Sequence, residues 1–122
     1  MIVTLTANPS LDRTVALPGA LQRGKVQRAL SDLRADVVFV GTNALRPGHG
    51  LTTPNSEEAA VKRALVRAGR QVVVLADSTK IGQENLVRFA TLDAVDVVIT
   101  DDEVDEAAVR ALDAAGVEVV VA

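Results

Sequence analysis

The sequence contains no cysteine, tryptophan or tyrosine, and its only aromatic residues are Phe39 and Phe89. The absence of cysteine excludes disulfide scaffolds, thiol catalysis and cysteine-ligated metals. Two phenylalanines are too few for an aromatic cage or a base-stacking platform. Positive charge is also scarce, because 13 Lys and Arg face 16 Asp and Glu, for a formal net charge of −3. We therefore expect no direct contact between this chain and nucleic acid.

Long hydrophobic runs are absent as well. No apolar stretch approaches the roughly 18 residues of a membrane span, and residues 1–6 carry no basic region typical of a signal peptide. We therefore expect a cytoplasmic protein without a membrane segment. The 122 residues are 48% hydrophobic and 24% charged, a globular composition with room for one full-sized domain.

Short segments rich in apolar and β-branched residues indicate β-strands, and those that are apolar at every residue indicate buried ones. The expected strands are residues 2–6, 13–17, 37–40, 72–75, 97–99 and 117–121. From residue 36 onward these strands alternate with helical patterns, which is typical of a parallel sheet covered on both faces. The sequence thus predicts an α/β fold with a partial, Rossmann-like parallel sheet.

Helical spacing of apolar residues supplies the connecting elements. Asn55 is the expected N-cap of a helix that ends at Gly69, with Glu58 in the capping-box position. A second helix is expected over residues 105–115, a short one over 25–33 and a helical turn near 85–89. Residues 41–55, which are rich in Gly and Pro, are expected to form a loop.

In such sheets ligands bind beyond the carboxyl ends of the strands. Asp77, Ser78 and Lys80 directly follow a predicted strand and combine carboxylate, hydroxyl and ammonium groups suited to a phosphate or a sugar. The alternative is a polar turn with a solvated lysine. The loop after the preceding strand supplies a second set of candidates, for which a structural glycine loop is the alternative: Gly41, Thr42, Asn43, Gly50, Thr52 and Thr53.

Other motifs carry less chemistry. Residues 19–26 nearly match a nucleotide-binding P-loop, but Val26 stands where the magnesium-binding hydroxyl belongs, so a turn before a helix is the simpler interpretation. His49 has no catalytic partner, and Glu58 with Lys62 is read as a helix-supporting ion pair. Asp101 belongs to an acidic turn that is more typical of helix capping than of a metal site. We expect no catalytic residue, metal or cofactor.

Residues 1–28 resemble the N-terminus of 1-phosphofructokinase, a ribokinase-type sugar kinase, through the run MIVTLTANPSLDRTV. The resemblance implies that Asp12 touches sugar hydroxyls. The glycine-rich sugar segment, the anion hole for ATP and the catalytic aspartate of that family have no counterpart here. Kinase activity is therefore not expected.

Residues 33–122 resemble the second half of the sugar-phosphate sensor domain of DeoR-family transcriptional repressors. The matching segments are ADVVFVGTN from residue 35, GLTTP from residue 50, EEAAVK from residue 57, ADSTKIG from residue 76 and VVITD from residue 97. The resemblance implies a fold related to ribose-5-phosphate isomerase and binding of phosphosugars without turnover. Ala44 departs from the glycine that the family often has there.

Taken together, the two resemblances imply a kinase-like segment over residues 1–30 and a partial DeoR-type sensor domain over 31–122. The family's winged helix-turn-helix and the first half of its sensor have no counterpart in the sequence. We expect a truncated, non-catalytic module that binds a small phosphosugar effector. The resemblances imply a fructose phosphate, because both families serve fructose uptake. We also expect a homo-oligomer that forms through exposed sheet edges. The alternatives are a kinase fragment and a remnant without a ligand.

Overall fold

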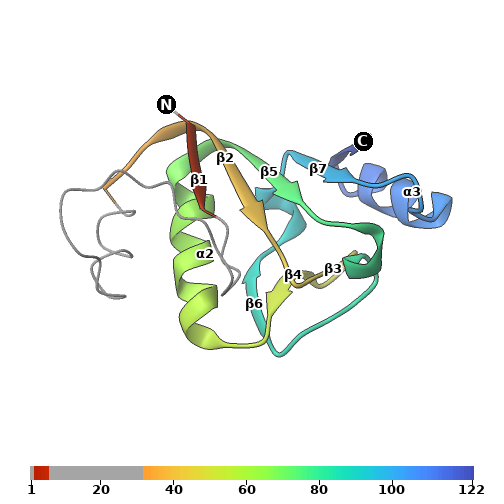
Figure 1. Cartoon of the computed structure of the whole chain (residues 1–122), viewed down its shortest axis with the longest axis horizontal. Helices are drawn as coiled ribbons and strands as arrows, with labels where there is room; N and C mark the ends of the chain where they lie inside the picture. The colour runs from red at the N-terminus through yellow and green to blue at the C-terminus, as the bar shows by residue number, and fades with distance from the viewer. Residues whose placement is uncertain (1, 6–31) are drawn as a thin grey trace.

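A computed structural model describes residues 2–5 and 32–122 of the chain (Figure 1). The strand expected over 13–17, nearly all of the helix expected over 25–33 and the candidate sugar contact Asp12 lie outside the described residues. For the first strand the backbone pairing is described, whereas side chains are described from residue 32 onward.

The central feature is a five-stranded, fully parallel sheet with the order β1-β2-β5-β7-β8. Its strands are β1 (Ile2–Leu5), β2 (Ala35–Gly41), β5 (Gly69–Leu75), β7 (Val97–Thr100) and β8 (Glu118–Val121). The five predicted strands that fall in the described part of the chain are confirmed, and so is the parallel α/β fold. β1 pairs with β2 and forms one outer edge of this sheet.

A second, three-stranded antiparallel sheet has the order β3-β4-β6. It consists of β3 (Ala44–Arg46), β4 (Gly50–Thr53) and β6 (Val87–Ala90). The predictions of a plain loop over 41–55 and of a helical turn near 85–89 are therefore wrong. Three- and four-residue strands are too short to show a period of two, and the Gly and Pro residues around them gave the stronger signal.

Helix α2 (Ser56–Ala68) and helix α3 (Glu106–Ala114) confirm the two main helix predictions. The Asn55 side chain caps α2 by accepting a hydrogen bond from the Glu58 backbone N–H at 2.8 Å, and Asp105 caps α3 in the same way through Ala107. Two short 3₁₀ helices, η1 (Ser78–Lys80) and η2 (Leu92–Ala94), complete the described elements.

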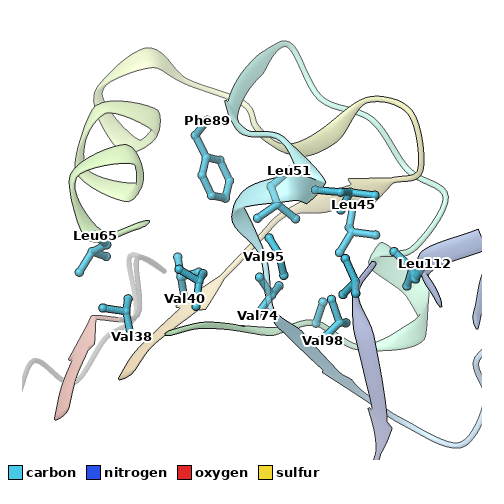
Figure 2. Packing of buried hydrophobic residues seen from close by; sticks show 14 of the residues in the cluster. Val38, Val40, Leu45, Leu51, Leu65, Val74, Phe89, Val95, Val98 and Leu112 are labelled. Atoms are coloured by element: carbon cyan, nitrogen blue, oxygen red, sulfur yellow. The ribbon is translucent and has the colours of Figure 1, made fainter. Parts of the chain in front are cut away.

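The two α-helices pack on the same face of the parallel sheet, and each contributes a leucine to the core labelled in Figure 2. Leu65 of α2 and Leu112 of α3 join one core with Val38, Val74 and Val98, whose side chains share that face by strand register. Each crossover steps in the same direction across the sheet, and right-handed connections then place their helices on one side. Leu45, Leu51 and Phe89 bring the antiparallel sheet into this core.

The opposite face of the parallel sheet carries neither described α-helix. Leu75, Ile99 and Val120 form a row across three strands on this face, because the register aligns them. Leu75 is 43% exposed and Val120 is 39% exposed. The sequence predicted helices on both faces of the sheet. The two described α-helices cover one of these faces.

Gly50 provides a direct test of the contact between β4 and β6. It has φ of +90°, and a Cβ atom at this position would lie 2.2 Å from the Ala90 carbonyl oxygen. Gly48 has the same φ, but its Cβ would meet nothing within 4 Å. We predict that Gly50→Ala lowers the free energy of unfolding by about 3 kcal/mol or more, whereas Gly48→Ala carries only the backbone strain of about 1 kcal/mol. Equal losses in urea unfolding would contradict this packing.

Candidate functional site

The carboxyl ends of the parallel strands lie side by side at one edge of the sheet. Gly41 is in register with Leu75, Leu75 with Ile99, and Thr100 with Val121. The segments after β2, β5 and β7, predicted as the ligand-binding loops, therefore start along the same edge. A hydrogen bond joins two of them, because the Ser78 backbone N–H donates to Asp101 Oδ2 at 2.8 Å.

Asp101 anchors this edge. Besides the bond from Ser78, its Oδ1 accepts a hydrogen bond from the Glu103 backbone N–H at 2.9 Å. The donors from Ser78 and Glu103 stabilise the carboxylate and lower the pKa of Asp101. Asp101, in the acidic turn expected from the sequence, thus binds both its own turn and the loop after β5. The N-cap of α3 is a different residue, Asp105.

The loop after β5 is shaped by Asp77. Its carboxylate accepts a hydrogen bond from the Thr79 backbone N–H at 2.9 Å and another from the Thr79 hydroxyl, which starts η1. The Lys80 N–H then donates to the Asp77 carbonyl, so that Lys80 lies one turn from Asp77. Among the described residues, the Lys80 ammonium has no hydrogen bond or ion pair, and its charge remains available to a ligand.

This loop also runs beside the segment after β2. Ile81 forms an isolated parallel bridge with Leu45, and the Gly82 N–H donates to the Leu45 carbonyl at 2.7 Å. The end of this loop, at Ile81 and Gly82, therefore lies beside Leu45 of the segment 41–53.

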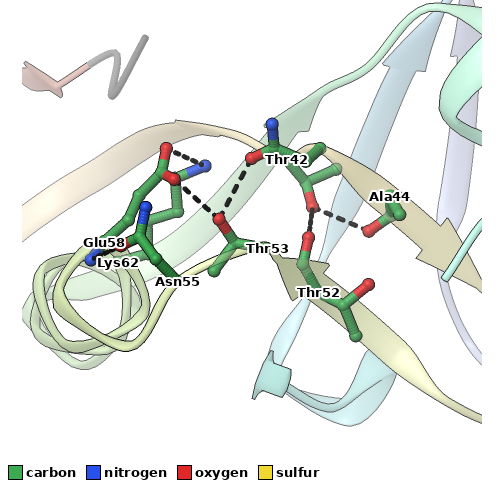
Figure 3. A network of polar contacts seen from close by, with 8 residues as sticks. Thr42, Ala44, Thr52, Thr53, Asn55, Glu58 and Lys62 are labelled. Atoms are coloured by element: carbon green, nitrogen blue, oxygen red, sulfur yellow. Dashed lines mark hydrogen bonds and ion pairs between the residues drawn. The ribbon is translucent and has the colours of Figure 1, made fainter. Parts of the chain in front are cut away.

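The three candidate threonines are buried and bonded inside the protein (Figure 3). Thr42 Oγ1 lies 2.8 Å from the Ala44 carbonyl and 3.3 Å from that of Thr52. The Thr52 hydroxyl accepts from the Asn85 backbone N–H, and the Thr53 hydroxyl donates toward Glu58 Oε2 at 2.8 Å. These hydroxyls hold the loops in place, whereas Asn43 is exposed and reaches Thr53 with one side-chain oxygen at 3.1 Å.

The glycines at this edge differ from one another. Added Cβ atoms would find open space at Gly41 but would overlap the backbone of β6 at Gly50. Gly41 therefore leaves room beside the strand end, and Gly50 is required for packing against β6.

The sequence predicts Lys62 as one half of a helix-supporting ion pair, and the structure shows that its side chain is only 3% exposed. Its ammonium lies 3.5 Å from Glu58 Oε1 and 5.3 Å from the centre of the Phe89 ring. Burial lowers the pKa of Lys62, although the Glu58 carboxylate acts in the opposite direction. This buried pair connects α2 to Thr53 and Asn43 (Figure 3). An i,i+4 spacing alone does not reveal burial, so the burial of Lys62 could not be predicted from the sequence.

A shallow hollow of about 390 Å³ opens at the ends of β5, β7 and β8. Its lining residues are Leu75, Ala76, Asp77, Ile99, Thr100, Asp101 and Ala122. Of the predicted site residues, Asp77 belongs to this lining, while Ser78 and Lys80 follow it in η1. The Thr100 hydroxyl is buried without a hydrogen-bond partner in the described structure. Sequence reasoning missed Thr100, because a threonine at a strand end gives no sign of being unpaired.

His49 lies at the turn between β3 and β4, where its Nε2 is 3.0 Å from Glu84 Oε1. Arg46 contacts the other oxygen of the same carboxylate at 3.1 Å. This surface cluster closes the hairpin against the segment before β6. Within residues 2–5 and 32–122, no three His, Asp or Glu side chains gather where they could hold a metal ion, and no helix there is long and apolar enough to cross a membrane.

Comparison with known proteins shows the family to which this chain belongs. The DeoR C-terminal sensor domain matches residues 18–102, and the chain belongs to that family. The match begins inside the segment 1–28 that we compared with 1-phosphofructokinase.

Similar proteins are transcriptional regulators. The chain is 40% identical over 118 residues to the HTH-type transcriptional regulator GlpR of Haloferax volcanii, an alignment that covers 97% of the chain and 45% of GlpR. It is 33% identical over 101 residues to the HTH-type transcriptional repressor GlcR of Bacillus subtilis, covering 83% of the chain and 39% of GlcR. The chain thus spans less than half the length of these two relatives.

The lowered pKa of Lys62 predicts how stability changes with pH. An unfolded lysine keeps its proton up to about pH 10.4, whereas the folded state releases it earlier. Between the lowered pKa and that value the unfolded state binds more protons, so the free energy of unfolding rises with pH. We predict that the wild type gains stability relative to Lys62→Met from pH 8 to pH 10.5 in urea unfolding. A constant difference would show that Lys62 titrates as if exposed.

Proposed function

We propose that this chain is a non-catalytic effector-binding module of a DeoR-type sugar-operon repressor and that the effector is a phosphosugar bound at the carboxyl edge of the parallel sheet. The observation that carries the proposal is the hydrogen bond between Ser78 and Asp101, which joins the loops after β5 and β7 beside a hollow. Thr100 lines this hollow, and its buried hydroxyl has no hydrogen-bond partner in the described structure. Family membership supports the class of ligand.

The polar groups at the carboxyl edge suit the two parts of a phosphosugar, the phosphate and the sugar hydroxyls. Lys80 offers a free ammonium for a phosphate, and the carboxylates of Asp77 and Asp101 accept hydrogen bonds from sugar hydroxyls. Asp77 Oδ1 already accepts two hydrogen bonds from Thr79, so Oδ2 is the Asp77 oxygen left for a ligand. Each Asp101 oxygen accepts one backbone hydrogen bond and keeps a second lone pair. Thr100 and Ser78 can donate to further oxygens. Thr42, Thr52 and Thr53 support the loops. Gly41 and Asn43 follow the neighbouring strand β2 and are proposed as further contacts, although neither lines the hollow.

A fructose phosphate remains our preferred effector. The support is the resemblance of residues 1–28 to 1-phosphofructokinase, together with 33% identity over 70% of the chain to a Bacillus subtilis regulator named FruR. By the same resemblance, Asp12 is proposed as a further sugar contact. Residual kinase chemistry is the alternative function, and a coupled assay with ATP and fructose 1-phosphate separates the two, because a sensor leaves both compounds unchanged.

Lys80→Ala tests the site directly. We predict that fructose 1-phosphate binds the wild type in calorimetry and that the variant binds at least about tenfold more weakly, because a charge-assisted hydrogen bond contributes about 1.5–3 kcal/mol. Neutral fructose is expected to bind weakly to both.

Arg110→Ala is the matched control, since it removes one exposed positive charge on α3, away from the hollow. Unchanged binding in Lys80→Ala would remove Lys80 from the site. No heat from any member of a phosphosugar panel would favour a remnant without a ligand.

We further propose that the chain self-associates through the face of the parallel sheet opposite α2 and α3. The support is the exposed apolar row of Leu75, Ile99 and Val120 on that face. A second copy with the same row would cover it by twofold symmetry.

Light scattering with Val120→Glu tests this association, because a charge in the row opposes burial. Val121→Glu is the control, since Val121 is also exposed, at 50%, but points to the other face of β8. We predict a smaller mass for Val120→Glu only. A monomeric wild type would contradict the proposal.

A further inference from the structure

A second hollow, of about 400 Å³, lies between α2 and β6 and shares no residue with the hollow at the carboxyl edge. Its lining residues are Arg63, Val66, Arg67, Arg88, Phe89, Ala90, Thr91 and Ala94. Three arginines thus line one small depression, and no carboxylate contributes to it. This concentration of positive charge stands out in a chain whose formal net charge is −3.

No carboxylate of the described residues pairs with any of the three arginines. Arg63 donates from Nη2 to the Arg88 carbonyl at 2.6 Å, which fixes its guanidinium between α2 and β6. Within the described part of the chain, the guanidinium groups of Arg67 and Arg88 have no hydrogen bond or ion pair. Asp93, which precedes the lining residue Ala94, accepts a hydrogen bond from the Thr91 hydroxyl.

Folding alone does not account for this arrangement. Arg63 and Arg67 are four residues apart on α2, and like charges at that spacing destabilise a helix by a few tenths of a kcal/mol. Arg67 lies in the last turn, where it complements the helix dipole, but Arg63 and Arg88 have no such compensation. The buried Phe89 ring and Val66 give the depression an apolar floor, and the fixed Arg63 gives it a partly preformed shape.

We propose that the hollow between α2 and β6 is a second binding site, specific for a small polyanion with at least two phosphate or carboxylate groups. Planar guanidinium groups pair with either group through two parallel hydrogen bonds. An anion placed between Arg67 and Arg88 relieves the repulsion among the three arginines. Because α2 also contributes Lys62 and Glu58 to the network beneath the carboxyl edge, this anion site contacts a helix shared with the effector region.

Titration of the whole chain with pyrophosphate and with citrate, at low salt and at 150 mM salt, tests the site. We expect the wild type to bind at least one of the two anions, and the preferred anion distinguishes a phosphate from a carboxylate ligand. The double variant Arg67→Gln with Arg88→Gln is expected to bind at least tenfold more weakly. Arg67→Lys keeps the positive charge but loses the planar guanidinium, so its affinity is expected to lie between those of the wild type and the double variant.

Arg110→Gln controls for net charge, and thermal unfolding of each variant controls for folding. Equal weakening in Arg110→Gln would show general attraction to a charged surface and overturn the proposal. Unchanged binding in a folded double variant would overturn it as well. Arg67 and Arg88 lie outside the effector edge, so the double variant is expected to bind fructose 1-phosphate as the wild type does. Failure of this site and failure of the effector site are therefore distinguishable.

Discussion

The structure depends on parallel pairing of β2, β5, β7 and β8 in one continuous register. Parallel strands bring all their carboxyl ends to a single edge, and the segments that follow them must then meet. The same directional order places α2 and α3 on one face, because each right-handed crossover steps the same way. One geometric constraint therefore creates both the candidate effector edge and the apolar face opposite the helices.

Polar side chains fix the loops at this edge more firmly than their positions in the sequence suggest. Asp101 holds the loop after β5 through Ser78, and Thr53 links the hairpin to Glu58 on α2. The buried Lys62 ends this chain of contacts at the Phe89 ring. A ligand that contacts the loops is thus connected to α2 by hydrogen bonds and packing, which is the physical basis on which an effector-binding domain can transmit a change in shape.

The parallel strands and both α-helices were predictable, because the strands carry short runs of valine, isoleucine and leucine and the helix caps carry clear signals such as Asn55. The antiparallel sheet was not, since Leu45, Leu51 and Phe89 reach the core from strands of three or four residues. Position after a strand also predicted that Asp77 and Lys80 would lie near the segment 41–53. It did not reveal that the threonines are satisfied internally, because hydrogen-bond partners distant in sequence decide that.

The most direct test of the central claim is mapping of backbone amide chemical shifts by NMR during titration with fructose 1-phosphate. Binding at the carboxyl edge predicts the largest changes at residues 41–43, 76–80 and 100–103, with smaller ones along the first turns of α2. Changes confined to residues 63–67 and 88–91, or shifts spread thinly over the whole chain, would contradict the assignment of the effector to this edge.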